Sequence, residues 1–286
     1  MPKYSTALDK LLFTIDRRKL PKDQASSGRI ISLYRIYYIM KGEVDYFIKD
    51  KCYRGREGDL VFVNTNTLSR NIYNSASERI LLKIDPAVME NLCSDIGNDD
   101  LIELFRNFNA VFHLRPKSKT RIEGILLNIL DEFAADNIGD ELMVKNLLTE
   151  FLIMLTREIN SHIKEGTVNS EIVMTKAGDI VAYINANYMQ ELSLRHLSDK
   201  FFISPYYMIK VFKKYTGFTV TEYINHIRIQ EAARLLGHRE AKVSYVAEVT
   251  GFNNTTNFSR VFKKIMHISP AKYRVSLTRT RGKKGL

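Results

Sequence analysis

The sequence predicts an α+β protein in two parts: an N-terminal antiparallel β-barrel with flanking helices, and a C-terminal all-α domain with two helix-turn-helix units. Short apolar runs separated by turn residues fill the chain as far as Asp85. The signature Val-Phe-Lys-Lys occurs at Val211–Lys214 and again at Val261–Lys264, fifty positions later, which indicates a duplicated unit. The length of 286 residues suits two domains.

The N-terminal strands are predicted from runs rich in Ile, Val, Tyr and Leu that end at turn residues. Lys41-Gly42-Glu43, Lys49-Asp50-Lys51 and Arg56–Asp59 are the expected turns. Short strands at near-even spacing are typical of a small antiparallel barrel or sandwich. We expect strands over residues 30–40, 44–48, 52–53, 60–64, 69–73 and 79–84.

Helices are expected after the barrel, over residues 86–93, 100–108, 117–135 and 140–163. The last two are amphipathic, with Ile122, Ile125, Ile129 and Phe133 on one stripe of the first. This pair either packs against the barrel or forms a face for a partner. The polar segment 165–171 is the expected linker. The domain boundaries are therefore 1–164 and 172–286.

The first helix-turn-helix unit begins at Ser193, which can cap a helix to about Phe201. Ser204-Pro205 is an N-cap followed by a first-turn proline and opens a second helix to about Tyr215. Met208, Val211 and Phe212 form its inward stripe. The opposite face suits a DNA major groove and carries Tyr206, Ile209, Lys210 and Lys213, with Lys214 beside it.

The second unit repeats this plan. A helix over residues 243–250 is followed by Gly251, which takes a left-handed turn without steric cost. Asn253 or Asn254 caps the next helix, which runs to about Met266. Its inward side chains are Phe258, Val261, Phe262 and Ile265. Its outer face carries Thr256, Asn257, Arg260 and Lys263, with Lys264 beside it; Thr, Asn and Arg can read bases, and Lys mainly binds phosphate.

A helix between the two units is predicted from the capping box Thr219-Val220-Thr221-Glu222 and runs to about Leu236. It would span about 27 Å. Such a strut can hold two reading helices about one turn of DNA, roughly 34 Å, apart.

Positive charge is concentrated in this C-terminal part. Residues 172–286 carry 19 Lys plus Arg and 7 Asp plus Glu, so they account for the whole formal net charge of +11. The rest of the chain is close to neutral. This segregation is expected of a protein that binds duplex DNA.

Several other classes are not indicated. The six histidines are scattered and no histidine precedes His113. Cys52 and Cys93 have no redox or metal spacing, so we expect reduced thiols and no cofactor or metal. No nucleophile elbow, phosphate loop or paired-carboxylate motif appears, so an enzyme is not expected. Residues 1–22 lack a signal-peptide core and no run is long enough to span a membrane, so a cytoplasmic protein is expected.

The C-terminal motifs resemble the DNA-binding domain of AraC/XylS-type transcription regulators over about residues 172–275. The matching residues include Phe202–Tyr207, Phe212–Phe218, Gly251-Phe252, Phe258–Lys264 and Ser269–Arg274. The resemblance implies two recognition helices inserted into neighbouring major grooves. Carried over by position, the base-facing candidates are Tyr206, Ile209, Lys210, Thr256, Asn257 and Arg260. Phe202 departs from the family, since glycine is common there.

The N-terminal part resembles the cupin-like regulatory domain of the same family, on Tyr37–Glu43 and Gly58–Asn64. A barrel mouth can bind a small molecule through its shape and a few polar groups. The candidate ligand-binding residues are Tyr34, Tyr37, Phe47 and Phe62, which could equally be core. Family members with this layout often dimerise through the helices that follow.

These observations predict a sequence-specific DNA-binding transcription regulator, an activator, whose barrel senses an effector or dimerises. Promoter DNA, RNA polymerase, a small-molecule effector and a second copy of the chain are the expected partners. Two alternatives stay open: a ligand-independent accessory DNA-binding protein, and a metal-free cupin enzyme fused to a DNA-binding domain.

Overall fold

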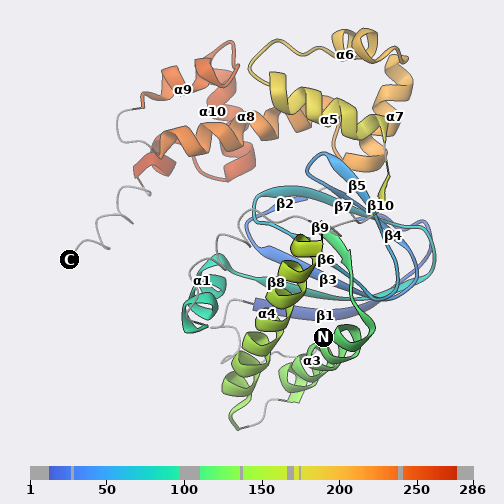
Figure 1. The fold of residues 1–286 in the computed structure, drawn as a ribbon. Helices are drawn as coiled ribbons and strands as arrows, with labels where there is room; N and C mark the ends of the chain where they lie inside the picture. The colour runs from blue at the N-terminus through green and yellow to red at the C-terminus, as the bar shows by residue number, and fades with distance from the viewer. Residues whose placement is uncertain are drawn as a thin grey trace. The chain divides into compact units, whose positions relative to one another are not determined.

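The computed structural model of the chain describes residues 13–26, 29–96, 110–135, 138–165, 171–173, 175–237 and 241–275. The chain divides into two compact units, Met1–Thr175 and Lys176–Leu286. The boundary expected at Ile172 falls within the last strand of the first unit, β10 (Glu171–Val173). Figure 1 shows strands gathered in the first unit and helices alone in the second.

The first unit contains two antiparallel sheets within the described residues, in the orders β1-β8-β3-β6-β9 and β10-β5-β4-β7-β2. They form a sandwich rather than the closed barrel expected. The strands are β1 (Phe13–Leu20), β2 (Arg29–Ile31), β3 (Tyr34–Lys41), β4 (Val44–Ile48), β5 (Lys51–Gly55), β6 (Asp59–Val63), β7 (Thr67–Tyr73), β8 (Ser77–Ile84) and β9 (Ala110–His113).

The single strand expected over residues 30–40 is wrong. The chain forms β2 and β3 there, and the two strands lie in different sheets: Ile30 pairs with Leu68 of β7, whereas Ile36 pairs with Leu82 of β8. The break at Ser32-Leu33 is where the chain crosses between sheets. Strands β1, β9 and β10, which lie at sheet edges, were not predicted.

Successive side chains along a strand point to opposite faces of the sheet, and both faces of the first sheet are buried. On β3, Tyr37 and Ile39 pack with Tyr46 and other residues of the second sheet, between the two layers. Tyr34, Ile36 and Tyr38 face the opposite way, toward helices. The helices α1 (Pro86–Asp95), α3 (Pro116–Ala135) and α4 (Asp140–Glu165) supply this second core.

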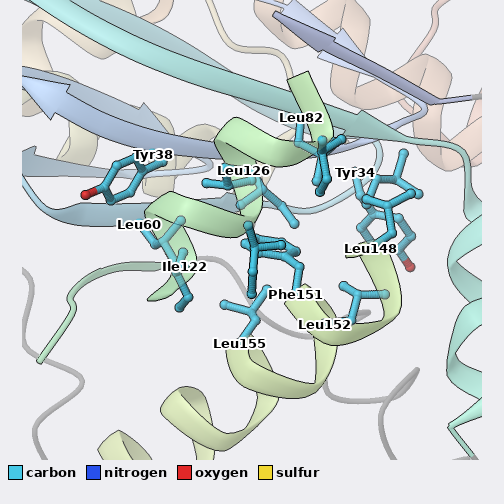
Figure 2. Packing of buried hydrophobic residues seen from close by; sticks show 14 of the residues in the cluster. Tyr34, Tyr38, Leu60, Leu82, Ile122, Leu126, Leu148, Phe151, Leu152 and Leu155 are labelled. Carbon is cyan, nitrogen blue, oxygen red and sulfur yellow. The ribbon is translucent and has the colours of Figure 1, made fainter. Parts of the chain in front are cut away.

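The amphipathic pair α3 and α4 therefore packs within its own unit. Figure 2 shows its apolar side chains directed at the sheet residues Leu60 and Leu82. Those labelled on the helices are Ile122, Leu126, Leu148, Phe151, Leu152 and Leu155. This intramolecular packing, one of the two roles anticipated for the pair, uses its main apolar stripe. The helix expected over residues 100–108 lies outside the described residues.

The second unit consists of helices α5 (Lys176–Asn187), α6 (Leu194–Phe201), α7 (Pro205–Thr216), α8 (Val220–Leu236), α9 (Val243–Val249) and α10 (Thr255–Met266), followed by a helical segment over residues 270–275. Helix α5, which was not predicted, packs against α7. Each of α6–α10 lies within one or two residues of its predicted range. No helix in the described part of the chain is long and apolar enough to cross a membrane.

Candidate DNA-binding surface

The first helix-turn-helix unit comprises α6 and α7 and is fixed by two serine caps. The Ser193 hydroxyl accepts from the His196 backbone N–H at 3.0 Å, and the Ser204 hydroxyl accepts from the Tyr207 N–H at 3.2 Å. Between the helices Phe202 has φ 53°, in the left-handed region. These caps satisfy N–H groups that a helix start leaves unpaired, so both helix starts are set by local sequence.

Helix α7 has one buried and one exposed face. Met208 and Phe212 are fully buried, and the Phe212 ring packs edge-on against Tyr223 of α8 with ring centroids 5.6 Å apart. On the other face Tyr206 is 77% exposed and Ile209 47% exposed. Lys210, Lys213 and Lys214 are also exposed. The predicted reading residues of the first unit therefore share one solvent-facing surface.

The second unit comprises α9 and α10 and has its own core. Phe258 and Phe262 are fully buried, and they pack with Phe252, Val246 and Ile229 of α8. Asn254 is the N-cap of α10, because its side-chain oxygen accepts from the Asn257 N–H at 2.7 Å. This resolves the choice between Asn253 and Asn254.

The outer face of α10 is polar. Thr256, Arg260, Lys263 and Lys264 are exposed, and Asn257 is half-buried. Arg260 donates from Nη2 to Asn257 Oδ1 at 3.0 Å, so the two candidate base-reading side chains are already in contact. That bond orders the guanidinium before any ligand binds, which lowers the entropy lost on binding.

Helix α8 joins the two units as a strut. Its capping box is complete: Thr219 Oγ1 accepts from the Glu222 N–H at 3.2 Å, and the Thr219 N–H donates to Glu222 Oε2 at 2.9 Å. At about 1.5 Å per residue its 17 residues extend about 25 Å. Tyr223 on this helix donates to Asn185 Oδ1 of α5 at 2.9 Å.

Arg228 of α8 connects the strut to the segments on either side. Its Nε donates to the Tyr188 carbonyl and its Nη2 to the Gln190 carbonyl, both at 2.8 Å. Its guanidinium also lies 5.6 Å from the centre of the Phe252 ring, just after the turn of the second unit. Its role as a link depends on contacts that a linear pattern does not show.

The exposed lysines of α7 and α10 give this surface a positive charge, which favours an anionic partner. Lys213 and Lys214 lie in the last turn of α7, and Lys263 and Lys264 in the last turn of α10. Glu222 lies near both helices, and the Thr219 N–H and hydroxyl that donate to its carboxylate lower its pKa, with Lys264 and Lys213 acting in the same direction. Burial lowers the pKa of the neighbouring His226, and Lys264 lowers it further, against an opposing effect of Glu222.

The four aromatic residues considered for ligand binding do not come together. Tyr34 and Phe62 pack against each other in the core beneath the helices, with ring centroids 5.9 Å apart. Phe47 is fully buried in β4. Tyr37 alone among the four lines the cavity between the two sheets. No group of three or more His, Cys, Asp or Glu that could hold a metal ion occurs in the described ranges.

Comparison with known families identifies the C-terminal and the N-terminal parts of the chain. Residues 197–276 match the family model described as a helix-turn-helix domain, and residues 25–152 match the AraC-like ligand binding domain. The chain is also 30% identical over 178 residues to the HTH-type transcriptional regulator YobQ of Bacillus subtilis, covering 57% of this chain and 72% of that protein. The chain belongs to the AraC family of transcriptional regulators.

Two further relatives match over about half of their own length. The chain is 28% identical to the regulatory protein PocR of Salmonella typhimurium over 137 residues, which are 47% of this chain and 45% of PocR. The chain is also 28% identical to the activator RhaS of Citrobacter koseri, over 47% of this chain and 49% of RhaS. The chain therefore spans about half the length of these two curated relatives.

The chain also matches two solved structures at low sequence identity. An apo ToxT variant from Vibrio cholerae is 17% identical, with a TM-score of 0.40, over 93% of this chain and 98% of ToxT. The DNA-binding domain of AdpA in complex with a target DNA is 22% identical, with a TM-score of 0.37, over 38% of this chain and 98% of that domain.

Proposed function

We propose that this AraC-type regulator binds promoter DNA in a sequence-specific manner and activates transcription. The supporting observation is the duplicated exposed face: α7 and α10 each bury apolar side chains on one side and carry lysines and candidate base-reading side chains on the other. A helix of that kind fits the major groove, where phosphate contacts fix its register and base edges are read by hydrogen bonds and apolar contacts. The DNA-binding unit is 172–286 in this proposal.

The residues assigned to DNA fall into two groups. Tyr206, Ile209, Lys210, Thr256, Asn257 and Arg260 face bases, and Lys213, Lys214, Lys263 and Lys264 bind phosphates. In the N-terminal unit the ligand-binding fold supports an effector-sensing or dimerisation role. An effector or a second copy of the chain would change promoter occupancy by favouring one arrangement of two DNA-binding units over another. RNA polymerase would be the downstream partner.

The test is binding of the full chain to its own upstream region at physiological salt, measured by fluorescence anisotropy against a scrambled duplex of equal composition. We expect the upstream region to bind more tightly by at least about a thousandfold, the lower end for specific binding. Equal affinity for the two duplexes would refute sequence-specific binding. Footprinting of the bound region should reveal two protected major-groove segments on one face of the duplex.

Phosphate contacts are tested by salt dependence. Lys213→Ala should lower the magnitude of the slope of log K against log salt by about 1, because each phosphate contact releases about one counterion. The matched control is Lys200→Ala, since Lys200 is an exposed lysine of α6 whose ammonium lies 5.3 Å from the Tyr183 ring centre. The control should leave the slope unchanged. A slope unaffected by Lys213→Ala would remove that residue from the phosphate-binding group.

A further inference from the structure

The N-terminal unit contains a polar cavity between its two sheets, with a volume of about 370 Å³. This lies at the lower end of the range for small-molecule sites, about 300–1,000 Å³. Both sheets contribute to its walls, β1, β3 and β8 from one and β7 from the other. Apolar side chains would fill such a space in an ordinary sandwich. The polar walls therefore indicate a use other than packing.

The walls carry an excess of positive charge. Among the described lining residues there are four cationic side chains and one carboxylate, Asp16. The carboxylate is shared, since Asp16 Oδ1 lies 3.0 Å from Arg18 Nε and 3.2 Å from Arg79 Nη1. Arg35 and Arg79 are buried, like charges held close together repel one another, and an anion placed among them relieves that cost. The four cationic residues are Arg18, Arg35, Arg79 and Lys83.

Arg79 is held in one orientation. Its side chain is buried, its Nε donates to the Tyr73 hydroxyl at 3.2 Å, and its guanidinium lies 5.4 Å from the centre of the Tyr37 ring. The Asp16 contact completes this arrangement. A planar guanidinium held in this way presents its N–H groups in a geometry that matches carboxylate and phosphate oxygens.

Arg35 is held in a similar way by the second sheet. It is only 2% exposed, its Nη2 donates to the Thr67 carbonyl at 2.9 Å, and its Nη1 donates to the Ser69 hydroxyl. Thr67 and Ser69 belong to β7, so Arg35 on β3 reaches across the space between the sheets. Two ordered guanidinium groups thus line the same cavity.

Asn71 of β7 supplies an acceptor. It is 3% exposed, and its side-chain oxygen makes no hydrogen bond to any atom in the described part of the chain. Its backbone is satisfied separately, because Asn71 N–H donates to the Ser26 hydroxyl and Ser26 N–H donates to the Asn71 carbonyl, both at 3.0 Å. A buried carbonyl oxygen without a donor is costly, and a ligand hydroxyl or amine would satisfy it.

We propose that this cavity binds a small hydroxylated anion, a polyhydroxy carboxylate or a sugar phosphate. The anionic group contacts Arg35 and Arg79, with Arg18 and Lys83 adding to the positive potential, and a ligand hydroxyl donates to Asn71. This assignment names the chemical class of the effector in the proposed function, and its regulatory meaning rests on that function. The binding itself does not depend on DNA.

The experiment is isothermal titration calorimetry of the full chain with gluconate and with glucose 6-phosphate. Two matched probes separate the contributions: glucose has the hydroxyls without the charge, and inorganic phosphate has the charge without the carbon skeleton. We expect saturable binding of at least one hydroxylated anion, at least about tenfold tighter than either control, since one charge-assisted hydrogen bond is worth about that factor. No binding of either hydroxylated anion would overturn the proposal. Equal binding of glucose, or of inorganic phosphate as an adventitious ion only, would also overturn it.

A matched pair of variants locates the site. Arg18→Gln and Arg17→Gln remove the same charge from neighbouring positions of β1, but Arg18 lines the cavity and Arg17 instead bonds to Glu78 at 2.7 Å. Arg18→Gln should weaken binding by about threefold, the factor expected of one exposed charge, whereas Arg17→Gln should leave it unchanged. Asn71→Asp retains the shape of the side chain and adds a negative charge, so it should abolish binding. Equal effects of the two arginine variants would place the ligand elsewhere.

Promoter binding of the same preparations, measured both with and without the hydroxylated anion, separates the two proposals. Saturable ligand binding without sequence-specific DNA binding would overturn the proposed function and leave the cavity assignment intact. Specific DNA binding without binding of either hydroxylated anion would overturn the cavity assignment and leave the proposed function intact.

Discussion

The two helix-turn-helix units have the same scaffold and different exposed chemistry. Each has a side-chain cap at the start of its second helix, buried apolar side chains on the inner face and a pair of lysines in the last turn. The first presents Tyr206 and Ile209 to solvent, whereas the second presents Thr256 and Arg260. In the proposed function, the core fixes where each reading helix lies, and the outer face determines which bases that helix reads.

The turns differ in the same way. Gly251 in the second unit has φ 86°, and a Cβ there would lie 2.8 Å from the Met189 carbonyl oxygen. Phe202 in the first unit is also left-handed, at φ 53°, but its side chain is 94% exposed. One turn is packed against another segment and requires glycine. The other faces solvent, so a side chain is tolerated there at the cost of backbone strain.

The largest expected effect tests that contrast in the turns. Gly251→Ala should lower the free energy of unfolding by about 2–3 kcal/mol, because it combines a strained φ with a clash against backbone. Phe202→Gly should change it by no more than about 1 kcal/mol, because it relieves strain and loses no packing. Calorimetric melting of both variants measures the difference. Equal destabilisation would show that the two turns are equivalent.

The next effect concerns base reading. Arg260→Ala should relax preference at one base pair by about 1–3 kcal/mol while changing affinity for scrambled DNA far less. Ile209→Ala should instead remove an apolar contact with a thymine methyl group. Replacing thymine by uracil in the site should then weaken the wild-type chain and leave Ile209→Ala unaffected. Binding competitions on single-base site variants measure both, and a uniform loss on all sequences for Arg260→Ala would contradict its assignment.

The smallest effect is a pH dependence of stability that arises in α8, the helix between the two helix-turn-helix units. Since the folded-state pKa of His226 is lowered from about 6.5, the unfolded chain binds its proton at a higher pH than the folded chain. The contribution to stability is complete above about pH 7 and is lost as pH falls through 6.5 toward the folded pKa. His226→Gln should reduce this loss in melting curves, and His196→Gln, at an exposed histidine, should not. Identical pH profiles for wild type and His226→Gln would exclude His226 as the cause.

The sequence predicted the C-terminal helical unit well because the signals that define its helices are local. Caps such as Ser193, Ser204 and Thr219 act within three residues, so the pattern that encodes them is contiguous. The crossing at Ser32-Leu33 is different, since it depends on which sheet each strand joins. The edge strand β1 was missed because only Phe13 and Ile15 are buried in it.

The cavity between the sheets was beyond sequence prediction for the same reason. Asn71 and Arg79 lie on strands of different sheets, and only the register of both sheets brings them to one space. The available signal was an arginine at an inward position of β8, two residues before the apolar Leu81 on the same face. The aromatic residues proposed for a pocket were chosen by type, and burial alone does not distinguish a pocket wall from core.

Strand β10 has a consequence for how the two units are tethered. It ends at Val173 and pairs only with β5 among the described strands, and two residues separate it from the start of α5 at Lys176. Two extended residues reach about 7 Å. If the three residues of β10 detach from β5, the connection to α5 lengthens by at least these three residues, which adds about 10 Å of reach. The backbone hydrogen bonds between β10 and β5 thus limit how far the DNA-binding unit can move from the first unit.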